Sequence, residues 1–145
     1  MLFGKRKRIV KRILVIEDEP LTAFDNEVML KDAGYDVVAT HDDFDEAVAA
    51  LNREKIDLIL SDVRLRGERT GIQLAEEAKR RGVPVLFVTG HPPENAHDLA
   101  IGCLRKPFSE RLLRQAIEAV DQHLAGKQPK VPKGLEIYPR PDAAS

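Results

Sequence analysis

The chain has 145 residues, of which 43% are hydrophobic and 32% charged, so it can bury the core of one domain beneath a solvated surface. The formal net charge of −1 hides an asymmetry, because the first twelve residues hold six basic residues and no acid, whereas the rest carries 17 basic and 24 acidic residues. An acidic domain with a short basic arm argues against a protein whose surface binds nucleic acid. No apolar run reaches the ~18 residues that a membrane span needs. The only cysteine, Cys103, rules out an internal disulfide and fits a cytoplasmic protein.

Short apolar runs alternate with amphipathic stretches along the first half of the chain. The pattern predicts, in order, a strand over residues 12–17, a helix over 20–33, a strand over 36–40, a helix over 43–55, a strand over 57–61 and a helix over 70–80. In the first helix, Phe24, Val28 and Leu30 are expected to form the apolar face, and Gly34 stands where a C-cap belongs.

The same alternation continues in the second half. It predicts a strand over residues 83–88, a turn or two of helix within 93–99, a strand over 101–104 and a last helix that follows Ser109. Strands that each precede a helix indicate an α/β domain with a parallel sheet, in which right-handed crossovers place the carboxyl ends of all strands at one edge. Residues 1–11 are expected to form a basic arm, 12–124 the domain, and 125–145 a flexible, proline-rich tail.

Polar side chains stand at the ends of four predicted strands. Glu17 and Asp18 end the first strand, Asp62 the third and Thr89 the fourth, while Lys106 follows the fifth. In a sheet with strand order 2-1-3-4-5 these strands are neighbours, so carboxylates, a hydroxyl and an ammonium would meet at one edge. Clustered carboxylates repel one another unless a hard cation such as Mg²⁺ neutralises them, and a carboxylate can accept a phosphoryl group as an acyl phosphate.

These motifs resemble the receiver domain of two-component response regulators. The resemblance rests on Glu17-Asp18-Glu19-Pro20, Asp62, Thr89-Gly90 and Lys106-Pro107-Phe108, in this order on consecutive strand ends, and it covers about residues 12 to 124. It implies a flavodoxin-like, doubly wound, five-stranded parallel sheet with the order 2-1-3-4-5. The segment Pro84-Val-Leu-Phe-Val-Thr-Gly-His91 also partly matches a motif of an alphaproteobacterial receiver subgroup linked to the general stress response, Pro-Phe-x-Phe-Ala-Thr-Gly-Tyr.

The resemblance implies a metal site and a phosphoacceptor. Asp62 would carry the phosphoryl group and would also be a ligand of Mg²⁺. Asp18 would ligate the metal directly, and Glu17 directly or through water. The backbone carbonyl of Arg64 would be a further ligand.

The resemblance also implies how the phosphoryl group is held. Lys106 would pair with its oxygens, and the Lys106–Pro107 peptide is expected to be cis. Thr89 would move to donate its hydroxyl. Family members couple this movement to an aromatic residue that lies three positions before the lysine, but Cys103 stands there. The switch pair of Thr89 and Cys103 therefore cannot operate in the family's usual form.

Two further departures from the family concern loops. Asp62 is followed by Val-Arg-Leu-Arg-Gly-Glu-Arg-Thr-Gly, which lacks the usual proline and has an additional residue before Gly71. The stretch from Thr89 to Lys106 is also shorter than usual, so we expect a stunted fourth helix.

The sequence predicts a stand-alone signalling module rather than a metabolic enzyme. A sensor histidine kinase or a phosphotransfer protein would supply the phosphoryl group. The 21 residues of the tail are expected to be too few and too rich in proline to fold as a DNA-binding or other output domain, so the output would be a protein–protein contact. We expect no membrane span.

Two alternatives use the same fold class. A Mg²⁺-dependent phosphatase with an aspartyl nucleophile usually has a second aspartate two residues after the nucleophile, where this chain has Arg64. A flavodoxin-like nucleotide binder would need a glycine-rich loop after the first strand, where this chain has Glu17-Asp18-Glu19-Pro20.

Overall fold

Strands and helices alternate through the domain as the apolar periodicity predicts. The computed structural model describes residues 8–65 and 70–139. Its elements are β1 (Arg12–Ile16), α1 (Pro20–Asp32), β2 (Asp36–His41), α2 (Phe44–Arg53), β3 (Leu58–Asp62), α3 (Gly71–Arg80), β4 (Val85–Thr89), α4 (Ala96–Leu99), β5 (Gly102–Arg105), α5 (Glu110–Leu124) and β6 (Leu135–Ile137).

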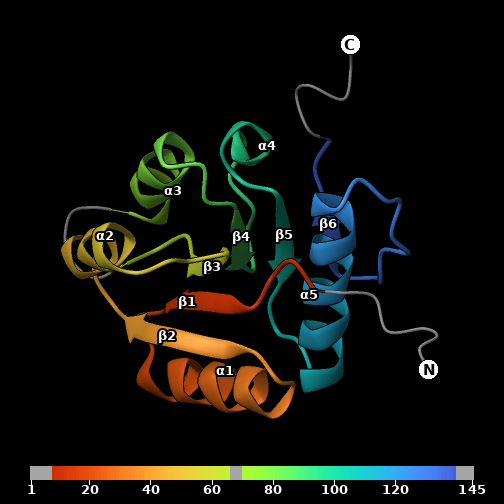
Figure 1. Ribbon diagram of the computed structural model, residues 1–145, viewed down its shortest axis with the longest axis horizontal. Coiled ribbons are helices and arrows are strands. Elements are labelled where there is room, and N and C mark those ends of the chain that lie inside the picture. The colour runs from red at the N-terminus through yellow and green to blue at the C-terminus, as the bar shows by residue number, and fades with distance from the viewer. Residues whose placement is uncertain (1–7, 66–69, 140–145) are drawn as a thin grey trace.

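The strands form one sheet in the order β2-β1-β3-β4-β5-β6. The pairs from β2 to β5 are parallel, which confirms the predicted doubly wound fold, and β6 adds to the edge of β5 in the antiparallel direction. Figure 1 shows α2, α3 and α4 together on one side of the sheet, away from α1 and α5. The carboxyl ends of β1, β3, β4 and β5 therefore lie side by side at one edge.

Two apolar clusters fill the space between the sheet and its helices. Within β1, Ile13 and Val15 face the cluster beneath α1 and α5, whereas Leu14 and Ile16 face the cluster beneath α2, α3 and α4. All four side chains are at most 1% exposed. Strands that are buried on both faces read as continuous apolar runs, which is why the sequence reveals them so clearly.

Side-chain caps fix where the longer helices begin. Thr70 and Gln73 form a reciprocal capping box at α3, in which Gln73 Oε1 accepts from the Thr70 amide at 2.8 Å. Ser109 Oγ accepts from the Leu112 amide at 3.1 Å at the start of α5. The short loop after Thr89 leaves room for only four residues of helix in α4, as predicted.

The predicted apolar face of α1 is correct for Leu30 and wrong for Phe24 and Val28. Leu30 is buried, but it packs inward together with Ala23 and Asn26, which lie on the same helix face at spacings of three and four residues. Phe24 and Val28 lie on another face and are 63% and 41% exposed. The helix carries two apolar stripes, and the sequence pattern alone does not tell which of them meets the sheet.

The expected tail is in part ordered. Residues 135–137 form β6, so the expectation of a flexible tail does not hold for them. The physical reason is that, without β6, β5 would be an edge strand with unpaired backbone groups. The returning chain forms hydrogen bonds with these groups.

The expected basic arm also packs onto the domain where the structure describes it. The amides of Ile9 and Val10 donate to the buried carboxylate of Asp121 at 2.8 and 2.7 Å, and the Val10 side chain is fully buried. Lys5, Arg6 and Lys7 lie outside the described residues. Among the described residues, no helix is long and apolar enough to cross a membrane.

Candidate functional site

The carboxylates predicted to meet at the sheet edge do meet. Glu17 and Asp18 follow β1, Asp62 ends β3, and carboxylate oxygens of these three residues lie within 4.8 Å of one another. We call these residues the acidic cluster. Oxygen donors at this spacing suit a hard divalent cation, which would relieve the repulsion between their charges. The residues present therefore fit Mg²⁺.

Lys106, from the loop after β5, bridges two members of the acidic cluster. Its Nζ donates to Glu17 Oε1 at 2.8 Å and to Asp62 Oδ2 at 3.1 Å. The Glu17 side chain is only 2% exposed and that of Asp62 14%, so the ammonium acts in a poorly solvated place. The Lys106–Pro107 peptide is cis, as predicted.

Burial and pairing act in opposite directions on the pKa values of this pair. Burial raises the pKa of Glu17, although the hydrogen bonds from Lys106 and from the Glu19 amide favour its charged form. Burial alone would lower the pKa of Lys106, but its bonds to Glu17 and Asp62 outweigh burial and raise it. Lys106 therefore keeps its positive charge at neutral pH.

The loop after Asp62 is held close beneath the carboxylate. The Arg64 amide donates to Asp62 Oδ1 at 3.3 Å, which places this residue beside the acidic cluster. The Gly71 amide donates to the Val63 carbonyl at 2.7 Å, and a Cβ added at Gly71 would stand 2.2 Å from the Asp62 carbonyl oxygen. Sequence reasoning used Gly71 only as a position to align and missed its steric role. A glycine that begins a helix just after a nucleophile loop was the signal available.

The structure does not bring Thr89 into contact with the acidic cluster. Its hydroxyl accepts from the His91 amide at 3.2 Å and, among the described residues, makes no hydrogen bond to Glu17, Asp18 or Asp62. Asp62 pairs in register with Val88, so Thr89 stands one residue further along the neighbouring strand.

Cys103 lies inside the sheet rather than at the site. Its side chain is 1% exposed within the cluster beneath α2, α3 and α4, and burial raises the pKa of its thiol to about 11. A thiol with such a pKa is almost wholly protonated at neutral pH and reacts slowly. The tail residue Tyr138 packs against the same cluster.

A second group of carboxylates has a structural explanation. Asp42, Asp43 and Glu46 offer oxygens within 4.8 Å of one another. Asp43 caps α2 by accepting from the Glu46 amide at 2.8 Å, and Glu46 Oε2 lies 2.8 Å from His41 Nδ1. Capping and pairing with His41 therefore account for Asp43 and Glu46 without a metal ion.

Comparison with known proteins places the chain among signalling receivers. The family model for the response regulator receiver domain matches residues 13–118. The transcriptional regulatory protein PdtaR of Mycobacterium tuberculosis is 37% identical over 116 residues, which are 76% of this chain and 56% of PdtaR. The phyllosphere-induced regulator PhyR of Methylorubrum extorquens is 37% identical over 82 residues, which are 55% of this chain and 31% of PhyR.

A solved structure gives the same result. The receiver domain of the PhyR response regulator from Erythrobacter litoralis has a TM-score of 0.68, with 28% identity over 85% of this chain and 96% of that chain. The similarity to PhyR confirms the resemblance that Pro84–His91 indicated. The chain spans about half the length of PdtaR and a third of PhyR. With its parallel sheet, its acidic edge and these relatives, the chain belongs to the response regulator receiver domain family of two-component signalling.

Proposed function

We propose that this receiver is phosphorylated on Asp62, with Mg²⁺, by the phosphohistidine of a sensor kinase or phosphotransfer protein, and that it signals through protein–protein contact. The observation that carries the proposal is the ammonium of Lys106, 3.1 Å from Asp62 Oδ2 and beside the acidic cluster. The similarity to PhyR, a stress response regulator, favours stress signalling as the setting.

The chain's own residues divide the chemistry between them. A carboxylate oxygen of Asp62 forms a bond to phosphorus while the N–P bond of the donor breaks and its imidazole leaves with the electron pair. Lys106 pairs with a phosphoryl oxygen, and Thr89 turns its hydroxyl toward another. Mg²⁺, held by Glu17, Asp18, Asp62 and the Arg64 carbonyl, would neutralise the charge that gathers there.

The receiver would catalyse only its own phosphorylation and dephosphorylation. The position that an aspartyl phosphatase uses for its acid/base carboxylate holds Arg64, whose amide points to Asp62 Oδ1 instead. An acyl phosphate formed on Asp62 would thus lack a nearby general acid at that position and would persist long enough to signal. A histidine-kinase donor and a reduced, buried Cys103 both suit the cytoplasm.

The exposed stripe of α1 is a suitable docking surface for the donor. Leu21, Phe24 and Val28 are 75%, 63% and 41% exposed on the helix that begins beside the acidic cluster. A hollow of about 250 Å³ between α1 and the Lys106–Phe108 loop continues this surface toward the site. Exposed apolar side chains gathered next to a reactive carboxylate indicate a protein contact.

Replacing Phe24 with serine should slow phosphotransfer from a protein donor without slowing phosphorylation by acetyl phosphate. We expect a loss of about tenfold, because a central apolar anchor contributes about 1 to 2 kcal/mol to such a contact. Initial rates with a kinase or phosphotransfer protein that phosphorylates the wild type would measure this. Val131→Ser, at a position 44% exposed in the tail, is the matched control and should behave as wild type. Equal slowing of both donors by Phe24→Ser would refute the docking role.

Mg²⁺ binding should depend on Asp18. We expect Asp18→Asn to weaken Mg²⁺ affinity by about tenfold or more, because it removes a charged oxygen ligand from the acidic cluster. Calorimetric titration would show it, as would loss of the rise in Tm that Mg²⁺ gives the wild type by binding the folded state. The control is Asp42→Asn, which removes the same charge from the other carboxylate group. Equal affinities for the wild type and Asp18→Asn would remove Asp18 from the metal site.

A further inference from the structure

After α5 the chain returns along the open edge of the sheet. β6 pairs with β5 through the register Gly102↔Ile137, Cys103↔Glu136 and Leu104↔Leu135. The Arg105 amide donates to the Gly134 carbonyl at 2.9 Å, and the Tyr138 amide donates to the Ile101 carbonyl at 2.9 Å. These bonds satisfy the edge of β5 as an additional strand would.

The edge is shaped for a close-lying strand. A Cβ added at Gly102 would stand 2.3 Å from the Glu136 carbonyl oxygen, so only glycine at this position lets another backbone approach so closely. Leu135 is buried against the cluster beneath α5, and Ile137 packs against the same cluster. The edge therefore accepts an extended segment with apolar residues at alternating positions.

β6 is held less firmly than the strands of the core. It has three residues, and only Leu135 among them is buried. Gly126 and Gly134, both at positive φ, flank a connection whose side chains are mostly exposed. A short strand on an exposed connection can open locally at a cost well below that of unfolding the domain.

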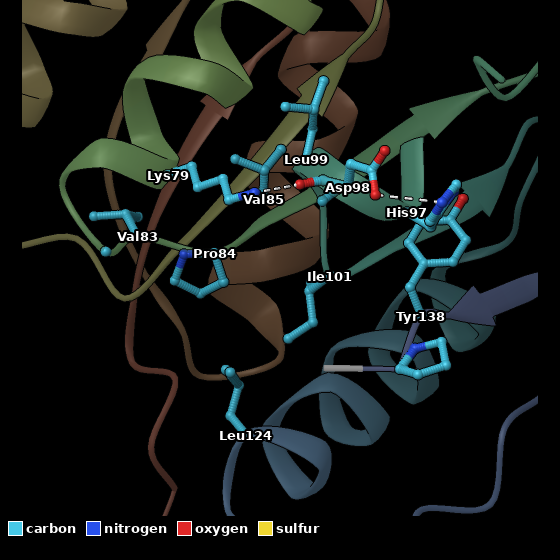
Figure 2. A pocket seen from close by; sticks show the side chains of 13 residues that line it. Lys79, Val83, Pro84, Val85, His97, Asp98, Leu99, Ile101, Leu124 and Tyr138 are labelled. Carbon is cyan, nitrogen blue, oxygen red and sulfur yellow. Dashed lines mark hydrogen bonds and ion pairs between the residues drawn. The ribbon is translucent and has the colours of Figure 1, made fainter. Parts of the chain in front are cut away.

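The residues that flank β6 connect it to Thr89 and to α4. Thr89 pairs in register with Arg105, whose amide bonds to Gly134, and the Lys106 amide bonds to the Thr89 carbonyl at 3.1 Å. Figure 2 shows the Tyr138 ring beside His97 of α4, with their centroids 6.5 Å apart and nearly perpendicular. A movement of Thr89 or α4 would thus reach β6 from two sides.

Figure 2 also shows a cavity that is lined by Tyr138, the residue that follows β6. Tyr138 closes one side of a cavity of about 300 Å³ between the end of α3, α4 and the start of β5. Lys79 crosses this cavity, where its Nζ donates to the Asp98 carbonyl at 2.7 Å. Tyr138 therefore links the tail to α4. It does so on the same face of the sheet as Cys103, which occupies the position where the family usually has an aromatic residue.

We propose that the edge of β5 is a docking surface for an extended segment of a partner protein, and that β6 is its intramolecular occupant. This inference rests on the proposed function, because phosphorylation of Asp62 would release β6 through Thr89 and α4. The partner segment pairs antiparallel with β5, with apolar residues in place of Leu135 and Ile137 and an aromatic residue in place of Tyr138. β6 itself shows the chemistry that the edge accepts.

A peptide with the sequence of residues 133–139 is the probe for the docking surface. In the full-length variant Leu135→Ala/Tyr138→Ala, whose own strand is weakened, the peptide should bind about tenfold or more tightly than to the wild type, where β6 competes. Adding Gly102→Ala to this variant should abolish binding, because its Cβ blocks any strand at this edge. Equal binding with and without Gly102→Ala would overturn the docking surface. If light scattering shows that the variant forms a concentration-dependent dimer, the proposal of a partner protein is overturned, because the segment at the edge of β5 would then come from a second copy of this chain.

Beryllofluoride with Mg²⁺ tests the release of β6. We expect amide exchange of Arg105 and Tyr138 in the wild type to rise by about tenfold on activation, but not in Thr89→Ala. If signals around Asp62 shift while both amides exchange as before, the release is overturned and the proposed function stands. If beryllofluoride leaves the signals around Asp62 unchanged, the proposed function and the release both fall, and the peptide alone decides the docking surface.

Discussion

Replacing Lys106 with methionine should lower the rate of Asp62 phosphorylation by about 100-fold, the usual loss when a donor to a developing charge is removed. The ammonium lies 2.8 Å from Glu17 Oε1 and 3.1 Å from Asp62 Oδ2. Methionine has a side chain of similar shape but carries no charge. Initial rates with acetyl phosphate and saturating Mg²⁺ would measure the loss. Because its partners raise the pKa of Lys106, the wild-type rate should not fall through deprotonation of this group as the pH rises from 7 to 9.

Arg105→Met is the matched control. It removes a positive charge from the adjacent residue, whose side chain is exposed and, among the described residues, makes no hydrogen bond to the acidic cluster. We expect its rate to stay within about twofold of the wild type, because exposed charges at this distance are screened. A Lys106→Met protein that is phosphorylated as fast as Arg105→Met would show that the ammonium has no part in the chemistry.

Replacing Gly71 with alanine should destabilise the fold by about 2 to 3 kcal/mol, the range for overpacking a tight site. The new Cβ would stand 2.2 Å from the Asp62 carbonyl oxygen and 2.9 Å from Val63 Cα. Both neighbours are backbone atoms, so the strand end or α3 must shift. Urea unfolding would measure the loss of stability, and the displaced Asp62 should also be phosphorylated more slowly.

Gly90→Ala provides the control for Gly71→Ala. A Cβ at Gly90 would meet nothing within 4 Å, so we expect its free energy of unfolding to stay within about 0.5 kcal/mol of the wild type. Equal stabilities of the two alanine variants would mean that the loop after Asp62 yields without cost, and that Gly71 does not position the carboxylate.

The parallel sheet was predictable because its strands are buried on both faces. β1, β3 and β4 each alternate between the two apolar clusters, so they appear in the sequence as apolar runs of valine, leucine, isoleucine and phenylalanine. The polar residues that end these runs then stand out. The sequence alone therefore predicts that Glu17, Asp18 and Asp62 lie at one edge.

The predictions for α1 and for the tail were wrong in part because tertiary packing decides between conformations that the sequence pattern does not distinguish. α1 carries an apolar stripe through Phe24 and Val28 and another through Ala23 and Leu30, and only the sheet decides that the smaller residues face inward. β6 has only three residues, which is too short a run for periodicity to identify. Its partner, the edge of β5, is distant in the sequence.

The finer geometry of the site was also beyond sequence reasoning. Lys106 was expected to hold a phosphoryl oxygen, but not to bridge Glu17 and Asp62, because the path of the loop after β5 is not encoded in a local pattern. The close approach of Gly71 to the Asp62 carbonyl likewise depends on how α3 packs against β3. Thr89 bonds to His91, a contact within its own loop.

The most direct test of the central claim is covalent labelling of Asp62. The wild type, incubated with radiolabelled acetyl phosphate and Mg²⁺, should incorporate label that hydroxylamine removes, as it does from an acyl phosphate. Asp62→Asn should incorporate none, because the amide that replaces the carboxylate is not a nucleophile, and chelation of Mg²⁺ should abolish labelling of the wild type. Undiminished labelling of Asp62→Asn, or label that resists hydroxylamine, would contradict the assignment of Asp62 as the phosphoacceptor.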